Sequence, residues 1–414
     1  MKNKIIISIL IQIIIASAVY SSESNCLNCH SDFEDENGAS QMITKDIHWQ
    51  KGLGCEGCHG GDPELDDMDE VREVKGYQGI PDTKDIPAFC ASCHADATYM
   101  HEHNPSLPTD QLDKYKTSVH GIQLLKEGDT KVANCISCHT VHQINSAELP
   151  HSSTHPQNIP GTCGKCHDDA DYMKEYGIDT NILSDYTVSV HGYALLEKGD
   201  LGAPACNDCH GNHGAAPPGV SSLAAVCGTC HAIEAELFND SPHKQAFEEN
   251  DIPMCETCHS NHKILHPKDE WIGSKEPSLC IECHSLDDGT IGLETADAIA
   301  ATLEKLIHAH SEAETTLSEA KEKGMMTTEE EFLLKEVEQS LIQTRTRLHS
   351  FNKDSVEPKA VVGIEKANLV RTNSAALIDE FYFRRIGLGI ATLFITLLCI
   401  GLYLKIRNSE KEKS

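Results

Sequence analysis

The stretch of sequence that decides the fold begins at Cys90 and ends at His142. It reads CASCHADATYM at 90–100, SVHG at 118–121, LLKEGD at 124–129 and CISCHTVH at 135–142. The same blocks return in the same order from Cys163 to His213, as CGKCHDDADYM, SVHG, LLEKGD and CNDCHGNH. A duplication of this length predicts an array of similar units stacked on one another.

Each set of blocks opens and closes on Cys-x-x-Cys-His, and the 414-residue chain contains nine such motifs. This spacing is the attachment signature of c-type haem. Each thiol can bond one vinyl group of a single porphyrin, and the imidazole then lies beneath the iron as its proximal ligand. We therefore predict nine covalently attached haem c groups. The attachment cysteines are Cys26, Cys29, Cys55, Cys58, Cys90, Cys93, Cys135, Cys138, Cys163, Cys166, Cys206, Cys209, Cys227, Cys230, Cys255, Cys258, Cys280 and Cys283, and the proximal histidines are His30, His59, His94, His139, His167, His210, His231, His259 and His284.

Other uses of paired cysteines explain the pattern less well. Zinc ribbons also contain Cys-x-x-Cys, but they do not need a histidine after every pair, and only 24 of the 414 residues are histidine. Disulfides within the pairs would form many small strained rings and would leave the histidines unexplained. The nineteenth cysteine, Cys399, lies in an apolar segment, where we expect it to act as a small apolar residue.

The composition agrees with a cofactor-filled interior. Only 5% of the residues are aromatic, so an ordinary apolar core is not expected, and porphyrins must supply much of the buried surface. We predict a mainly α fold with much irregular structure wrapped around the cofactors. The net charge of −30 argues against nucleic acid as a partner, because phosphate binding needs a basic face. The many cysteines argue against a reduced cytosolic protein.

The motifs group into four two-haem units, followed by a single motif at Cys280. We call the units the first copy (Cys26–His59), second copy (Cys90–His142), third copy (Cys163–His213) and fourth copy (Cys227–His262). Seven further histidines recur at fixed places, either between the motifs of a copy or three residues after a proximal histidine. Such residues cannot easily reach the far side of the same iron, so we predict that they are distal ligands of neighbouring haems. These histidines are His48, His120, His191 and His243, and then His142, His213 and His262.

Two haems remain without an assigned distal ligand. In the first copy, Asp62 stands where the other copies have histidine, so that unit must find a ligand elsewhere or lack one. Other histidines show weaker signals: the candidates are His101, His103, His151, His155, His266, His308, His310 and His349.

The two ends of the chain indicate export and membrane attachment. Residues 1–18 begin with Lys2 and Lys4, continue through an apolar run and end in Ala-Ser-Ala, as expected for a signal peptide. Residues 386–404 are uncharged and long enough to span a bilayer. The expected domains are the signal peptide (1–18), a nonahaem domain (19–289), a helical hairpin and stalk (290–383), a transmembrane anchor (384–407) and a cytoplasmic tail (408–414). The basic flank after the span favours an inside location for the tail.

The segment after the last motif is predicted to be helical. The residues Ile299, Leu303, Leu306, His310, Ala313, Leu317 and Ala320 form one face of a helix that Gly324 ends. Thr328 and Glu331 are a candidate capping box for a second helix, whose face holds Leu334, Val337, Leu341, Thr344, Leu348 and Phe351. A third helix is expected from about Pro358 towards the membrane. His310 lies on the apolar face, where a histidine can be either a core residue or a ligand.

The nine motifs identify a multihaem cytochrome c over residues 26–284. The long helices that follow resemble those of the superfamily of pentahaem nitrite reductases and hydroxylamine oxidoreductases. This resemblance implies oxidoreduction near a membrane, commonly coupled to the quinone pool or to a terminal reductase. The Cys-x-x-Cys-Lys motif that usually binds the active haem of ammonia-forming nitrite reductases does not occur in this sequence. The resemblance therefore supports the class and not a substrate.

Two functions follow from these patterns. The first is a membrane-anchored electron carrier whose haems have two histidine ligands. It would lie on the periplasmic or extracellular side of the cytoplasmic membrane, and its partners would be a quinone-linked membrane subunit and a soluble cytochrome or reductase. The alternative is an enzyme that acts on nitrite, hydroxylamine or sulfite at one open haem. A conductive polymer subunit is a third possibility, against which the membrane anchor speaks.

Overall fold

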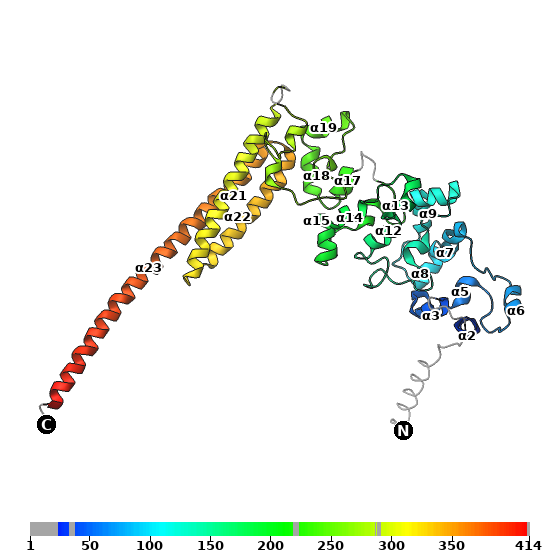
Figure 1. Ribbon diagram of the computed structural model, residues 1–414, viewed down its shortest axis with the longest axis horizontal. Helices are drawn as coiled ribbons and strands as arrows, with labels where there is room; N and C mark the ends of the chain where they lie inside the picture. The colour runs from blue at the N-terminus through cyan, green and yellow to red at the C-terminus, as the bar shows by residue number, and fades with distance from the viewer. Residues whose placement is uncertain (1–23, 33–37, 218–222, 286, 288–290, 412–414) are drawn as a thin grey trace. The chain divides into compact units, whose positions relative to one another are not determined.

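The computed structural model describes residues 24–32, 38–217, 223–285, 287 and 291–411. Within these residues the chain is mostly helical and has no strand, so the predicted fold class is confirmed (Figure 1). The predicted signal peptide lies outside the described residues.

The chain divides into two compact units. Unit 1 comprises residues 1–219 and 260–266, and unit 2 comprises residues 220–259 and 267–414. The domain limits expected from the sequence remain predictions.

Unit 1 consists of short helices joined by loops. Its helices are α2 (Asn25–Ser31), α3 (Ala39–Met42), α4 (Ile47–Gln50), α5 (Cys55–His59), α6 (Met68–Glu73), α7 (Ile86–His94), α8 (Ala97–His103), α9 (Gln111–Thr117), α10 (Val119–Ile122), α11 (Cys135–His139), α12 (Ile159–His167), α13 (Ala170–Met173), α14 (Ile182–Thr187), α15 (Val190–Gly192) and α16 (Cys206–His210). Shorter helical turns are η1 (Ile43–Lys45), η2 (Thr83–Asp85), η3 (Gln123–Glu127), η4 (Lys174–Tyr176) and η5 (Tyr193–Glu197).

One backbone hydrogen bond recurs wherever a copy in unit 1 meets the next. The donor is the backbone N–H of the residue just before a between-motif histidine. The acceptor is a backbone carbonyl near the end of the following copy, two residues after the histidine that closes this copy. The three bonds are Ile47 N to Ile144 O (2.8 Å), Val119 N to Ala215 O (3.1 Å) and Val190 N to Ile264 O (2.8 Å). In the fourth copy the equivalent residue is Pro242, which has no N–H to donate. Successive copies in unit 1 are therefore joined to one another by the same backbone hydrogen bond.

The turn that carries the between-motif histidine has the same capping in the second and third copies. The buried Ser118 hydroxyl accepts a hydrogen bond from Gly121 N (2.9 Å) and donates one to Tyr115 O (2.7 Å). A Cβ atom on Gly121 would lie 1.8 Å from Tyr115 O, so only glycine fits this close approach. Ser189, Gly192 and Tyr186 repeat the arrangement in the third copy.

Unit 2 contains three motifs and a bundle of long helices. Its elements are α17 (Leu223–Gly228), α18 (Ala232–Asn239), α19 (Pro242–Glu249), α20 (Glu256–His259), η7 (Asp269–Trp271), η8 (Cys280–Glu282), α21 (Gly292–Glu322), α22 (Thr328–Arg347), η9 (Leu348–Ser350) and α23 (Lys353–Lys411).

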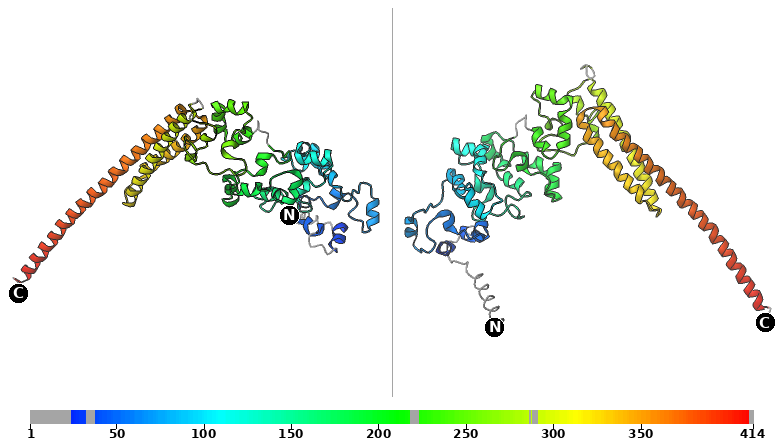
Figure 2. Two further views of the ribbon diagram at one scale, coloured as in Figure 1. Left: turned by 45° about the horizontal axis from the view of Figure 1, so that its top comes forward. Right: turned by 180° about the vertical axis from the view of Figure 1, so that it is seen from behind.

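Helices α21, α22 and the first half of α23 pack side by side, as Figure 2 also shows. Their shared core consists of Leu306, Ala313, Leu317, Val337, Ala360, Ala367 and Val370. The three helices approach closely at Gly363, where a Cβ would lie 2.6 Å from a Leu306 methyl carbon and 2.9 Å from Ser340 Cβ. The first half of α23 is thus the third helix of a bundle, in addition to leading into the long apolar segment.

The helix boundaries in unit 2 refine the sequence predictions. The apolar face predicted for α21 is buried at Ile299, Leu303 and Leu306, whereas His310 is half-buried. The predicted capping pair was wrong by one residue, because Thr327 precedes the helix and its hydroxyl bonds the Glu331 carboxylate at 2.8 Å. Helix α23 begins at Lys353, before the expected start near Pro358.

Helix α23 continues well beyond the bundle. Among the described residues it alone is long and apolar enough to cross a membrane, with an 18-residue window of mean hydropathy 2.2 whose side chains are unburied. The end of the α21–α22 hairpin lies beside α23 shortly before this segment. There the Lys323 ammonium lies 5.7 Å from the Phe381 ring centroid and 5.3 Å from that of Tyr382.

Candidate functional site

Most described motifs lie on a short helix or helical turn. Helices α5, α11 and α16 each begin at the first cysteine of a motif and end at its histidine. Positions i, i+3 and i+4 share one face of a helix, so both thiols and the imidazole point to the same side. The cysteines are not joined in disulfides, contrary to a disulfide framework. This is the local geometry that attachment of one porphyrin through two thioethers requires.

Motif histidines face histidines from outside the motifs. Seven ring pairs each combine one motif histidine with one spare histidine. Their centroid separations and interplanar angles are His48–His94 (5.9 Å, 84°), His59–His142 (6.2 Å, 40°), His120–His167 (6.1 Å, 60°), His139–His213 (6.1 Å, 11°), His210–His262 (5.9 Å, 14°), His243–His284 (6.0 Å, 88°) and His259–His349 (6.0 Å, 24°).

The separations fit one iron between two imidazoles. A ligating nitrogen lies about 2 Å from its metal, and adding the ring radius on each side places the two centroids roughly 6 Å apart. Ordinary aromatic pairs can have similar separations, but they would not pair a motif histidine with a spare one every time. In the part of the chain that the structure describes, no three or more metal-binding side chains converge on one point. The histidines instead meet in twos, as axial ligands do.

Hydrogen bonds at Nδ1 leave Nε2 for a metal in several pairs. His59 Nδ1 lies 2.7 Å from Gly79 O, His210 Nδ1 lies 3.2 Å from Ala216 O, and His349 Nδ1 lies 3.0 Å from Thr346 O. A metal-binding histidine typically donates its other N–H in this way, which fixes its tautomer and ring orientation.

Burial lowers the pKa of most of the paired imidazoles. Desolvation, reinforced in most cases by a neighbouring histidine, lowers the pKa of nine of them below the usual value. Since a metal binds the unprotonated ring nitrogen, this shift favours ligation. The nine are His94, His120, His139, His142, His167, His213, His243, His259 and His262.

The pairs follow a fixed offset between copies. A histidine three residues after a motif faces the motif two places earlier, as His142 faces His59 and His213 faces His139. A between-motif histidine faces the first motif of the next copy, as His48 faces His94. Six of the seven predicted distal histidines therefore lie opposite a motif histidine. The seventh, His191, occupies in α15 the place that His120 occupies in α10.

The offset changes the interpretation of Asp62. A histidine at this position would face a motif two places before that at Cys55, and this motif would lie outside the first copy. The aspartate is therefore not a ligand missing from its own unit.

His349 is the partner that sequence reasoning ranked low. It lies in η9 at the end of α22 and faces His259 of the last two-motif copy. According to the same offset, the partner of His259 would be a histidine three residues after a motif in a further copy. The helical bundle supplies His349 instead. The only sequence signal was its place at the edge of the α22 stripe.

Five other weak candidates have different surroundings. His103 stacks on Tyr99 with ring centroids 4.1 Å apart, and His101 is exposed. His155 is buried, and its Nδ1 accepts a hydrogen bond from Gln157 N. His308 lies on the surface of α21 near Glu312. His310 Nε2 is buried without a hydrogen-bond partner.

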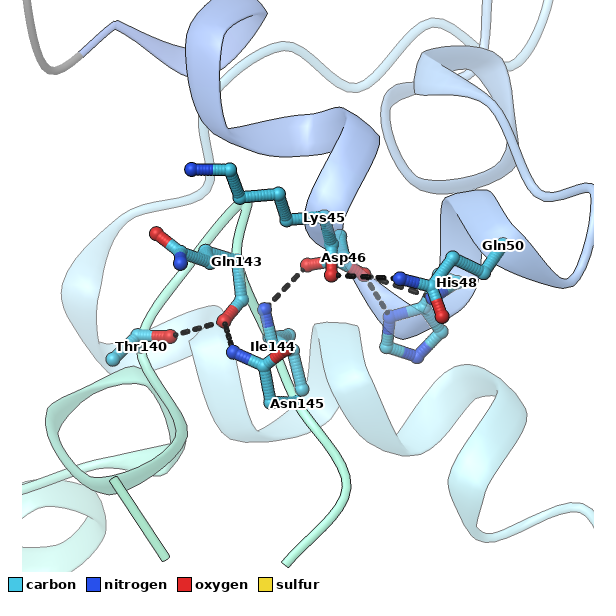
Figure 3. Close-up of polar contacts among 8 residues, drawn as sticks. All are labelled: Lys45, Asp46, His48, Gln50, Thr140, Gln143, Ile144 and Asn145. Carbon is cyan, nitrogen blue, oxygen red and sulfur yellow. Dashed lines mark hydrogen bonds and ion pairs between the residues drawn. The ribbon is translucent and has the colours of Figure 1, made fainter. Parts of the chain in front are cut away.

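Asp46 is a functional candidate that sequence reasoning missed. Its buried carboxylate accepts hydrogen bonds from His48 Nδ1 (2.9 Å), His48 N (2.9 Å) and Ile144 N (2.6 Å), as Figure 3 shows. Burial alone would raise the pKa of Asp46, but the bonds from His48 and Ile144 outweigh it and hold the pKa below its usual range. Alignment of DIH at 46–48 with SVH at 118–120 could have indicated it.

Successive motifs are neighbours within each unit. The thiols of Cys90 and Cys135 lie within hydrogen-bonding reach, and so do those of Cys163 and Cys206, and of Cys227 and Cys255. Between these pairs, the second cysteine of one motif lies close enough to the next motif for electrostatic interaction. Examples are Cys58 with Cys90, Cys138 with Cys163, and Cys258 with Cys280.

Comparison with known proteins points to the same chemistry. Residues 12–60 match the family of cytochrome c554 and c-prime, and they include the motifs at Cys26 and Cys55. A C-type polyheme cytochrome, OmcC, from Geobacter sulfurreducens is 35% identical over 75 residues. That alignment covers 17% of this chain and 9% of the relative, so the chain matches only a small part of it.

Proposed function

Starting from a multihaem c-type cytochrome with covalently bound haem c, the class that both matches support, we propose that this chain is a nonahaem electron carrier. Eight of the nine haems would be held by two cysteines and two of the histidines identified above, and α23 would anchor the chain in a membrane. The resemblance to the nitrite reductase and hydroxylamine oxidoreductase superfamily remains part of this proposal. The observation that carries the function is the set of seven motif–spare histidine pairs, each with centroids close to 6 Å apart.

The residues around eight of the nine predicted haems favour electron transfer without substrate binding. In this proposal His48, His120, His142, His213, His243, His262 and His349 occupy the distal positions that the pairs define, and His191 does so by its equivalence to His120. When bound, haem c supplies a reversible one-electron couple. Two strong axial ligands leave no open position for a substrate, so these histidines restrict the chemistry to accepting and giving up electrons.

The spacing of the motifs supports a continuous path within each unit. In unit 1 successive motifs follow in chain order with their thiols within hydrogen-bonding or electrostatic range, and in unit 2 the same holds for the motifs at Cys227, Cys255 and Cys280. Close packing of the attachment residues brings neighbouring cofactors near one another. The chain itself would therefore set the order in which redox centres follow each other.

The anchor and partners form the second part of the proposal. A single pass of α23 would leave the haem units outside the cytoplasmic membrane and the tail (408–414) in the cytoplasm, in agreement with its basic flank. The strongly acidic chain would exchange electrons with a membrane subunit linked to quinone on one side and a soluble cytochrome or reductase on the other.

The enzyme alternative has lost part of its motivation. The enzyme alternative depends on an open haem, which was suggested by Asp62 in place of a histidine and by two haems without an assigned distal ligand. The offset between copies gives Asp62 no role as a missing ligand, and His349 faces a motif histidine. We therefore place the electron carrier ahead of an oxidoreductase for nitrite, hydroxylamine or sulfite.

The test uses the full-length holoprotein in lipid nanodiscs. Intact mass and a haem-to-protein ratio count the attached groups, and low-temperature EPR of the oxidised protein reports their spin states. Nine attached groups are expected, and the eight haems with two assigned histidines should give low-spin signals. Fewer than nine groups would contradict the haem assignment, and a high-spin signal perturbed by nitrite, hydroxylamine or sulfite would contradict the closed carrier.

A further inference from the structure

We propose that Asp46 is a positioning residue that lowers the reduction potential of the haem held between His48 and His94. It thereby distinguishes this site from the otherwise matched site between His243 and His284. The inference rests on the proposed haem ligation.

The contacts of Asp46 are directed at a ligand. One carboxylate oxygen accepts hydrogen bonds from both Nδ1 and the backbone N–H of His48, each at 2.9 Å. The other oxygen accepts from Ile144 N at 2.6 Å, in the following copy (Figure 3). Only 2% of Asp46 is exposed, so water does not compete for these bonds. The carboxylate therefore fixes the ring orientation of His48 through a short, fully formed set of contacts.

The other copies have serine at the equivalent position. The hydroxyls of Ser118 and Ser189 accept from a backbone N–H of their own turn and donate to a backbone carbonyl. Ser241 in the fourth copy likewise donates to Phe238 O. These serines cap the turn with a neutral group, whereas Asp46 caps it with a carboxylate that also reaches the imidazole. The difference is a feature of one copy and not of the repeat.

The chemical effect follows from the charge on the acceptor. A carboxylate that accepts the Nδ1–H pulls this proton away from the ring and makes Nε2 a stronger electron donor. A stronger donor stabilises the oxidised iron more than the reduced iron, which lowers the reduction potential. A backbone carbonyl, as at His59 and His210, acts in the same direction but without a full charge.

The site at His243 is a natural comparison. Its ring pair matches that of His48 in separation, 6.0 Å against 5.9 Å, and in interplanar angle, 88° against 84°. However, His243 Nδ1 is buried without a hydrogen-bond partner. The two sites thus share ligand type and ring geometry and differ in what Nδ1 bonds. We expect the site at His94 to have the lower potential of the two.

The test is an EPR-monitored redox titration of full-length holoprotein in nanodiscs. Near-perpendicular imidazole planes give low-spin signals with large g anisotropy, so these two sites are observed apart from the near-parallel ones. In the parent protein the two large-g signals should titrate at different potentials. Asp46→Asn and Asp46→Ser should raise the lower potential towards the other. Asp67→Asn, which removes an exposed capping carboxylate from α6 without contact to a histidine, is the matched control and should change neither.

A reciprocal variant makes the test independent of any folding defect at Asp46. Ser241→Asp places a carboxylate at the equivalent turn beside His243 and should lower the potential of that site alone. The proposal is overturned if both Asp46 variants retain their haems and g-values while the lower potential stays unchanged. It is also overturned if Ser241→Asp binds all haems and shifts no potential. If the parent protein shows neither large-g signal, the proposed bis-histidine ligation of these two haems is refuted instead.

Discussion

The imidazole of His349, at the end of α22, faces that of His259 with their ring centroids 6.0 Å apart and their planes 24° apart. A histidine of the helical bundle is thereby paired with one of the haem-binding motifs. Both lie in unit 2, although they are far apart in the sequence.

Replacing His349 should open one haem. In His349→Ala we expect one low-spin signal to be replaced by a high-spin signal, because the iron loses one of its two strong axial ligands. EPR and the high-spin absorption band measure this. His308→Ala removes a surface histidine of α21 and should leave the spectrum unchanged. Unchanged spin states in His349→Ala, with all haems attached, would rule out this ligand.

The ring angles predict the pattern of EPR signals. Two parallel imidazole planes interact with the same iron d orbital and separate its energy from that of the second d orbital of the same type. Perpendicular planes interact with one orbital each and leave the two nearly equal in energy. We therefore expect moderate g anisotropy from the three pairs with angles of 11°, 14° and 24°, and large anisotropy from the two pairs at 84° and 88°. His243→Ala should remove one of the large-g signals, whereas His213→Ala should remove a moderate one. The reverse result would contradict the ring geometry.

Glycine is required in the turns that carry the between-motif histidines. Gly121→Ala would place a methyl group 1.8 Å from Tyr115 O, so we expect the turn to shift and His120 to lose its position. The measurement is haem stoichiometry and thermal stability of the purified protein. Gly161→Ala is the matched control, because it lies in helix α12 with no atom within 4 Å of the added methyl group. The control should keep its stability or gain somewhat under 1 kcal/mol, since alanine loses less backbone entropy in a helix.

Two truncations separate the anchoring and packing roles of α23. A chain that ends after Arg385 keeps the helix segment that buries Ala360, Ala367 and Val370, and should leave the membrane fraction while remaining folded. A chain that ends after Phe351 exposes the core of α21 and α22, so its bundle should melt. Membrane fractionation and far-UV circular dichroism report the two outcomes. Retention of the first truncation in membranes would contradict anchoring by α23.

Repetition determined what the sequence could predict. His120 and His191 stood out because they recur at one offset from a motif, and six of the seven recurrent histidines face a motif histidine. The sequence did not show which motif each one faces, because that depends on how one copy meets the next. The junction bond from Val119 to Ala215 has no residue-specific signature.

Residues that do not recur in the other copies could not be identified from the sequence. His349 has no counterpart in another copy, so periodicity placed it only at the edge of a helical stripe. Asp46 was hidden because its role requires Ile144, a residue of the next copy. The start of α22 was off by one because Thr327 and Thr328 are both plausible caps, and only the bond from Thr327 to Glu331 distinguishes them.

The length of α23 has a consequence for electron entry. The helix begins at Lys353, just after the turn of His349, and reaches the apolar segment at Ile386. At about 1.5 Å per residue this distance is about 50 Å. Electron tunnelling falls exponentially with distance, so in an anchored chain a quinol within the bilayer cannot reduce the centre at His259 directly. The bundle would hold that centre away from the lipid surface, and a donor must itself extend from the membrane to meet it.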